Sequence, residues 1–431
     1  MWKIRALRAG IRLDGPLGTR AAVVVTTAGF AGSLLAGSIV QAPPAAANMG
    51  ICAIQRQNLF GGTPTPPPPA PTADGVGYGY VYDADCAADP GDRVVADPAY
   101  QYNSTRNPNS VDHVDVGSYV VRFAGLGQPG GIAHVTAYGP DLAPAAPGEP
   151  PQTGQCKVAS WRSNGPDQLV AVRCFTPSGQ PVDRQFTASY TNMRAFSGYD
   201  YGYLFANNPT AASYTPDPSS QYSTNVDQPL NKVVRTGVGR YTVAMTGVVV
   251  NATYNSVLVS AAGITYDPAT KRVVNGNVTC QVSGSYGSTA TIGCYAGGKP
   301  ADSQFTLTYV GKGNLFDAPN RPKSGGTSGA LPSSYAWAAA GTTGTPQADW
   351  AFSTYGTGTM AQVYDPSTGI TKVTMPPYTG WGDVQAVAHG DQAGYCGVVN
   401  WSDQAVEVQC WDGYGNISAL PFNVFFTGRD W

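Results

Sequence analysis

Internal repetition constrains this chain more than any other feature. Three segments spaced by about 120 residues each open with an alternating aromatic run and later carry two cysteines in a predicted hairpin. This spacing exceeds that of solenoid or propeller repeats and matches the size of one small β-sandwich. The sequence therefore predicts an all-β fold of three tandem antiparallel β-sandwich repeats, immunoglobulin-like or similar, each with a disulfide inside a hairpin.

Four kinds of run recur in the repeats. In order they are Tyr78–Tyr82, Tyr201–Phe205 and Tyr335–Trp337; Tyr102–Thr105, Tyr222–Thr224 and Phe352–Thr354; Tyr119–Phe123, Tyr241–Met245 and Thr371–Met375; and Phe186–Tyr190, Phe305–Tyr309 and Phe422–Phe426. They alternate with period two between Gly, Pro and Asp turns, which predicts strands with one buried face. We expect about seven strands per repeat and almost no helix.

The first residues predict a secretory signal. Five basic residues precede an uncharged run from Ala21 to Val40, and three alanines ending at Ala47 form a small-residue cleavage site. A membrane anchor is the alternative, but glycine and proline dilute the run, and no second apolar stretch of about 18 residues follows. The expected organisation is a signal peptide (1–47), an N-terminal segment with a proline-rich spacer (48–76), repeats at 77–192, 193–311 and 334–431, and a Gly/Pro/Ser-rich linker (312–333).

Charge and composition limit the partners. The formal charge of the chain is −2, but residues 1–47 hold five of the 25 basic and one of the 27 acidic residues, which leaves 20 basic and 26 acidic residues and a charge of −6. No basic cluster follows the signal, which argues against nucleic acid or anionic lipid as partners. Only 12% of residues are charged, a composition typical of extracellular β proteins. We therefore expect a secreted or cell-wall-associated protein with no membrane span after signal cleavage.

The eight cysteines predict disulfides, because their number is even and the chain is bound for an oxidising compartment. The expected pairs are Cys52–Cys86, Cys156–Cys174, Cys280–Cys294 and Cys396–Cys410. Zinc is the alternative, but the chain has no CxxC and only three histidines. For Cys52 and Cys86, partners from another chain stay open.

In a hairpin register centred on the turn, the two cysteines of a repeat lie directly opposite each other, and valines such as Val158, Val172 and Val398 share their face. The disulfides should therefore face the core and act as structural cross-links, each closing a loop of about 14–18 residues worth about 3 kcal/mol.

The opposite face of these hairpins offers a candidate ligand platform. Its aromatic members are Trp161, Phe175, Tyr395, Trp401, Trp411 and Tyr414, and polar residues such as Lys157 and Gln409 accompany them. Flat rings beside polar groups can stack on the apolar faces of sugars. The alternative, which we favour, is that these rings pack against a neighbouring repeat or cover strand ends.

No catalytic, cofactor-binding or metal-binding residue is predicted. His134 and His389 belong to no repeated constellation, and no GxSxG, HExxH or phosphate-binding loop accompanies them. Asp183 and Asp302 precede the last strand of their repeats and are expected to cap turns. The acidic loop at residues 83–92 could offer oxygen ligands to calcium, but it lacks the EF-hand spacing.

The hairpin of the first repeat resembles a repeat found in exported proteins of actinomycetes and other high-GC bacteria. The resemblance rests on Cys156–Trp161, Val170–Phe175 and Gly179–Asp183, with Val135–Gly139 before them, and it is weaker in the other repeats. That group has no assigned activity. The resemblance implies export and a repeat architecture, and it carries over no catalytic or binding residue.

We therefore expect a non-catalytic binding or scaffolding protein whose partner is polysaccharide, cell wall or a protein surface. One alternative is a glycan hydrolase or other hydrolase with its site in a single repeat, which would need two carboxylates in a cleft or His134 beside an Asp and a Ser. Another is an inhibitor or a structural coat protein.

Overall fold

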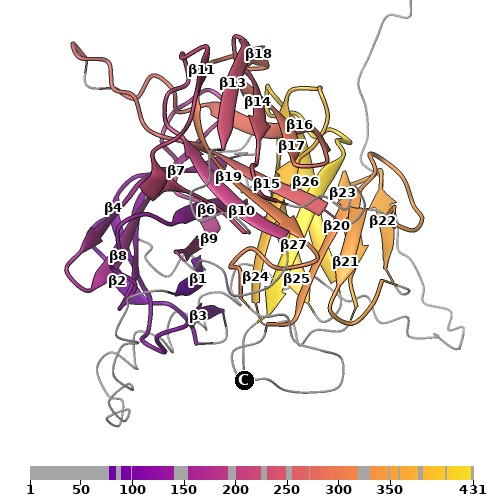
Figure 1. Ribbon diagram of the computed structural model, residues 1–431, viewed down its shortest axis with the longest axis horizontal. Helices are drawn as coiled ribbons and strands as arrows, with labels where there is room; N and C mark the ends of the chain where they lie inside the picture. The colour runs from indigo at the N-terminus through magenta and orange to yellow at the C-terminus, as the bar shows by residue number, and fades with distance from the viewer. Residues whose placement is uncertain are drawn as a thin grey trace, which may run out of the picture. The chain divides into compact units, whose positions relative to one another are not determined.

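A computed structural model (Figure 1) describes residues 77–83, 89–98, 100–139, 154–192, 200–224, 231–248, 255–270, 272–318, 331–347, 350–357, 360–376, 382–402 and 405–428. The expected signal peptide, the proline-rich spacer, the Cys52–Cys86 pair and the centre of the acidic loop lie outside these ranges. Within them, no helix has the length and apolar character needed to cross a membrane.

The described chain is all-β, as predicted, and its one helical element is a short 3₁₀ turn. The first unit contains β1 (Tyr78–Asp83), β2 (Arg93–Val95), β3 (Gln101–Asn103), β4 (Ser110–Asp115), β5 (Ser118–Phe123), β6 (Ile132–Tyr138), β7 (Gln155–Asn164), β8 (Asp167–Phe175) and β9 (Gln185–Thr191). The second contains β10 (Asp200–Ala206), β11 (Ser213–Tyr214), the 3₁₀ turn η1 (Pro218–Ser220), β12 (Gln221–Ser223), β13 (Lys232–Gly237), β14 (Arg240–Ala244), β15 (Asn255–Ala262), β16 (Val278–Tyr286), β17 (Thr289–Ala296), β18 (Lys299–Pro300) and β19 (Gln304–Gly311). The third contains β20 (Ser333–Ala338), β21 (Ala351–Ser353), β22 (Ala361–Asp365), β23 (Ile370–Thr374), β24 (Gly382–Ala388), β25 (Gly394–Ser402), β26 (Ala405–Asp412) and β27 (Phe422–Gly428).

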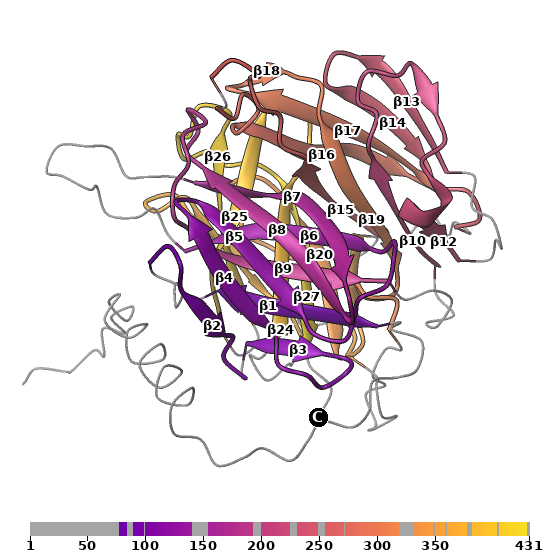
Figure 2. The same cartoon turned by 90° about the vertical axis from the view of Figure 1, so that its left-hand side faces the viewer.

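Each unit pairs its strands into two sheets in the same order. We call β3-β1-β9-β6 and its counterparts β12-β10-β19-β15 and β21-β20-β27-β24 the inner sheets. The hairpin sheets are β2-β4-β5-β8-β7, β11-β13-β14-β17-β16 and β22-β23-β26-β25. In Figure 2 the hairpin sheet of the first unit faces the viewer, with β2, β4, β5 and β8 side by side. Apolar side chains from both sheets of the first unit, such as Val81, Val135 and Val172, form one core, so the unit is sandwich-like.

The units are joined through strand pairing in a closed cycle. The last strand of each inner sheet forms a parallel bridge with the cysteine strand of another unit; the bridged pairs are Ala262 with Val158, Tyr138 with Val398 and His389 with Val282. In each case the next glycine (Gly263, Gly139 or Gly390) donates its N–H to the carbonyl of that valine at 2.8–2.9 Å. The second unit therefore joins the first, the first joins the third, and the third joins the second.

The inner sheets are buried on both faces, so the expectation of strands with one buried face is wrong for them. Every residue of β15 and β24 is buried, as are all residues of β1. The reason is that β6, β15 and β24 contact one another. The second face of each inner sheet thereby packs against the other units, at a place that we call the three-way junction.

The start of the predicted linker also belongs to this packing. Residues 312–318 are buried apart from Lys312, and the ring of Phe316 stacks on Tyr78 with 5.1 Å between ring centroids. Thr191 Oγ1 donates to the Phe316 carbonyl at 3.1 Å, and Tyr201 Oη donates to the Leu315 carbonyl at 3.0 Å. This part of the segment is core that packs against inner strands of two units. Residues 319–330 of the predicted linker lie outside the described residues, and at its end Leu331 is buried and Ser333 begins β20.

The three intra-hairpin disulfides are confirmed. Cys156–Cys174, Cys280–Cys294 and Cys396–Cys410 are bonded, with Cα separations of 4.0, 4.1 and 4.0 Å. In each hairpin the two cysteines are directly opposed, and valines two residues further share their face and the core.

A β-bulge then shifts the register of each hairpin. It falls between Val158 and Ser160 in the first unit and between Val398 and Asn400 in the third. One extra residue reverses the alternation of faces. The prediction that Trp161 and Trp401 lie opposite the cysteine face is therefore wrong, because Trp161 is paired with Val170 and Trp401 with Val406, both on the core side.

Candidate binding groove beside Trp161

The six platform aromatics do not form a shared exposed surface. Phe175, Trp401, Trp411 and Tyr395 are buried; Trp161 is half-buried; Tyr414 is exposed. Tyr395 is paired with Trp411 as expected, and the two rings stack at 5.3 Å.

Phe175 and Tyr414 lie against glycines of the second unit. A Cβ placed on Gly276 would lie 2.7 Å from Phe175, and one on Gly298 would lie 3.0 Å from Tyr414. The packing alternative therefore describes Phe175 and Tyr414, even though much of Tyr414 stays exposed to solvent. It also describes Trp401 and Trp161, which meet rings of a neighbouring unit.

Equivalent positions at the boundaries of the cycle carry aromatic clusters. Between the third and first units, Trp401 contacts Tyr82 and Tyr138 with centroids 5.1 Å apart and Tyr100 at 6.0 Å, all edge to face. These four rings fill the boundary, and Trp401 is only 8% exposed. Aromatic pairs in this geometry stabilise beyond the area that they bury.

The boundary between the first and second units keeps only half of this cluster. Trp161 occupies the position of Trp401, and it meets Phe205, the counterpart of Tyr82, at 4.8 Å. Ser220 is the counterpart of Tyr100, because it directly precedes the residue that pairs with Leu204. Ala262 is the counterpart of Tyr138, because each of them forms the parallel bridge to a neighbouring unit. Two small residues thus stand where two tyrosines close the other boundary.

A surface groove of about 740 Å³ opens at this place. It is lined by Trp161 and Phe205 and by the polar side chains of Gln128, Ser160, Arg162, Ser163, Gln168, Asn207, Ser220 and Gln304. Its volume lies within the range of small-ligand sites. Arg162 is the one charged side chain of this lining, so the groove offers a flat aromatic surface surrounded by neutral hydrogen-bonding groups.

The local structure fixes the walls of the groove. The bulge turns Trp161 toward the boundary, and its Nε1 donates to the Gly130 carbonyl at 3.2 Å. Gln304 Nε2 donates to the Asn207 carbonyl at 2.9 Å on the other wall. An anchored ring loses little conformational entropy when a ligand binds, which favours recognition.

The boundary between the second and third units differs again. Ser285 stands at the position of Trp161, opposite Ala290 in the shifted register. Trp337 meets Trp350 at 5.1 Å and His389 at 6.2 Å. Burial lowers the pKa of His389 to about 4, so this ring is neutral near pH 7.

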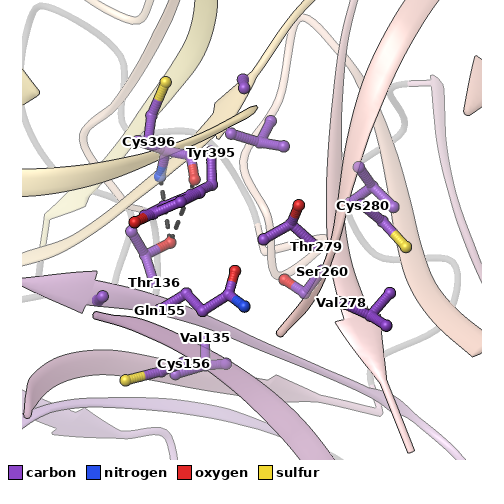
Figure 3. A pocket seen from close by; sticks show the side chains of 16 residues that line it. Val135, Thr136, Gln155, Cys156, Ser260, Val278, Thr279, Cys280, Tyr395 and Cys396 are labelled. Atoms are coloured by element: carbon purple, nitrogen blue, oxygen red, sulfur yellow. Dashed lines mark hydrogen bonds between the residues drawn. The ribbon is translucent and has the colours of Figure 1, made fainter. Parts of the chain in front are cut away.

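A smaller pocket lies at the three-way junction (Figure 3) and measures about 50 Å³. Side chains from all three units line it, among them Thr136, Gln155, Ser260, Thr279 and Tyr395. Thr136 Oγ1 donates to Gln385 Oε1 at 2.6 Å, while Gln155 Oε1 is buried without a partner among the described residues. This space suits a few water molecules better than an organic ligand.

His134, the histidine considered for hydrolytic catalysis, is buried. His134 is fully inside the junction, where Nδ1 lies 3.2 Å from Ser260 Oγ and Nε2 lies 2.8 Å from Thr308 Oγ1. Burial lowers the pKa of His134 to about 3. None of the hydrogen-bond partners of His134 among the described residues is a carboxylate. Neither the groove beside Trp161 nor the pocket at the three-way junction is lined by two carboxylates.

The two matched aspartates cap turns, as predicted. Asp183 Oδ1 accepts from Gly117 N at 2.6 Å, and Asp302 Oδ1 accepts from Gly239 N at 2.8 Å. Arg235 adds a bidentate ion pair to Asp302 and holds the pKa of that carboxyl below its usual value. In the described part of the chain, no group of three or more His, Cys, Asp or Glu residues is placed to hold a metal ion.

Comparisons with protein-family models, with curated proteins and with solved structures gave no match to this chain. Sequence reasoning included Trp161 among the candidate residues but missed Phe205 and Ser220, which line the groove with it. An alignment of the repeats could have revealed the difference between the boundaries, because Ala262 aligns with Tyr138 and Ser220 aligns with Tyr100.

Proposed function

We propose that this chain is a secreted or cell-wall-associated protein that binds neutral carbohydrate, without catalysis, in the groove beside Trp161. We also take its three units to be tandem copies of one immunoglobulin-like sandwich. Three disulfides support an oxidising, extracellular setting.

The observation that carries the proposal is the contrast between two equivalent boundaries. At Trp401 four aromatic rings fill the space, whereas at Trp161 two rings remain and a groove of about 740 Å³ opens beside them. A groove produced by small residues beside a retained tryptophan is a ligand site, because packing alone would favour filling it.

The chemistry of the lining selects the ligand class. A half-exposed indole can stack on the apolar face of a pyranose ring. Amide and hydroxyl groups of Gln128, Asn207 and Ser220 can exchange hydrogen bonds with sugar hydroxyls. With Arg162 as the single charge of the lining, neutral sugars fit this groove better than polyanions.

A glycan array probed with the purified full chain tests the proposal. Wild-type protein should bind a set of neutral oligosaccharides, and Trp161→Ala should lose that binding. Tyr286→Ala is the matched control, because Tyr286 is an exposed aromatic residue, 82% accessible, outside the groove. Absence of neutral glycan binding by wild-type protein, or equal binding by Trp161→Ala, would refute the proposal.

A further inference from the structure

A second surface depression, of about 530 Å³, lies between the first and second units away from the Trp161 groove. One wall is the turn that joins β4 to β5, with Val114 and Val116. The opposite wall comes from the second unit and includes Tyr266 and Arg272, and Arg173 of β8 contributes to the lining.

Two arginines of this depression differ from most others in the structure. The guanidinium groups of Arg93, Arg122 and Arg235 each bind a carboxylate. Among the described residues, the Arg173 guanidinium donates to the carbonyl of its neighbour Val172, at 3.2 Å, and the side chain of Arg272 forms no ion pair. Two cations that pair with no carboxylate in the described part of the chain therefore line one depression of a protein with net negative charge.

The rest of the lining includes exposed apolar side chains. Val114 is 53% exposed, Val116 is 48% exposed and Tyr266 is 53% exposed, which is unusual for large apolar residues that gather in one place. Asp115 is the single carboxylate of the lining, and it accepts the N–H of Val116 at 2.8 Å. Exposed valines favour the apolar side chains of a peptide as partners.

We propose that this depression binds an acidic peptide segment of another extracellular protein, with Arg173 and Arg272 pairing its carboxylates and Val114 and Val116 contacting its apolar side chains. Arginine binds carboxylates through two parallel hydrogen bonds, so two guanidinium groups that pair with no carboxylate among the described residues select Asp, Glu or a C-terminal carboxylate. The site is separate from the Trp161 groove, since the two linings share no residue.

An array of random hexapeptides, probed with the full chain at low and at high salt, tests this inference. Bound peptides should be enriched in Asp and Glu next to Val, Leu or Ile, and binding should weaken with salt. The double variant Arg173→Gln/Arg272→Gln should bind these peptides at least about tenfold more weakly. Arg106→Gln is the control, because Arg106 is exposed and does not line the depression.

The outcomes separate this proposal from the carbohydrate proposal. Trp161→Ala should leave peptide binding unchanged, and the double arginine variant should leave neutral glycan binding unchanged. No enrichment of acidic peptides, or equal binding by the double variant, would overturn the inference. Acidic oligosaccharide binding that the double variant loses, without any peptide binding, would also overturn it by assigning the site to a glycan.

Discussion

Trp161 of the first unit and Phe205 of the second unit meet across their boundary with ring centroids 4.8 Å apart and planes inclined by 63°. The same contact is made by Trp401 and Tyr82 at 5.1 Å, where two further tyrosines complete the cluster. One chain thus contains a filled and an open version of the same boundary. Comparing the two boundaries therefore distinguishes rings that pack units together from rings that stay partly exposed to a ligand.

The two tryptophans should respond differently to truncation. Trp401→Ala removes a ring from a filled four-ring cluster, so we expect a loss of about 3–5 kcal/mol in the free energy of unfolding. Trp161→Ala should cost less, about 1–2 kcal/mol, because its ring is half-exposed beside an open groove. Urea denaturation followed by tryptophan fluorescence measures both values. Equal losses would contradict the distinction between the two boundaries.

The buried Asp383 should make stability fall with rising pH. Burial raises the pKa of Asp383 to about 7, although the amide of Gln385 donates to the carboxylate at 3.0 Å. The folded protein therefore holds this proton up to a higher pH than the unfolded chain. The contribution of Asp383 is complete below about pH 4 and is lost as pH rises through about 7.

Asp383→Asn should remove this dependence. The variant should match wild-type protein near pH 4 and exceed its free energy of unfolding by about 2–4 kcal/mol at pH 8. Denaturant titrations of both proteins across this range measure the difference, which isolates Asp383 from other titrating groups. A difference that does not change with pH would contradict the assignment.

Lys157 should act in the opposite direction. It is buried, its Nζ donates to the Asn275 carbonyl of the second unit at 2.8 Å, and burial lowers its pKa to about 7. The unfolded chain therefore binds more protons between about pH 7 and 10, and this group makes stability rise with pH across that window.

The equivalent position in the second unit indicates which residue to substitute for Lys157. Gln281 stands at the position of Lys157 and donates to the carbonyls of Gly390 and Gln392 at 2.6 and 2.8 Å. We expect Lys157→Gln to raise the free energy of unfolding by about 1–3 kcal/mol at pH 6, with a smaller gain at pH 10. A larger gain in the free energy of unfolding at pH 10 than at pH 6 would contradict the expected pH dependence.

The repeated runs and the opposed cysteines were predictable from sequence because both follow from the period of two in β-strands. Tyr78–Asp83 is a strand, as expected, and Cys156 faces Cys174 among core valines. The stacking of Tyr395 on Trp411 followed from the same register. These features depend only on local alternation and on pairing within one hairpin.

Other features depended on contacts that no local pattern reveals. A bulge after Val158 reversed the faces of the hairpin, and alternation alone places Trp161 on the wrong side. The second buried face of β15 exists because three units meet, so its residues cannot be judged from one sandwich. Phe316 lies in a Gly- and Pro-rich segment typical of a linker, yet it stacks on Tyr78.

The most direct test of the central claim is to fill the groove with a ring that closes its counterpart. Ser220→Tyr introduces the counterpart of Tyr100 at a residue that lines the groove, so the variant should keep its cooperative unfolding transition. On an array of neutral oligosaccharides, wild-type protein should bind and this variant should not. Binding by the folded variant at the wild-type level would contradict the assignment of the groove beside Trp161 as the carbohydrate site.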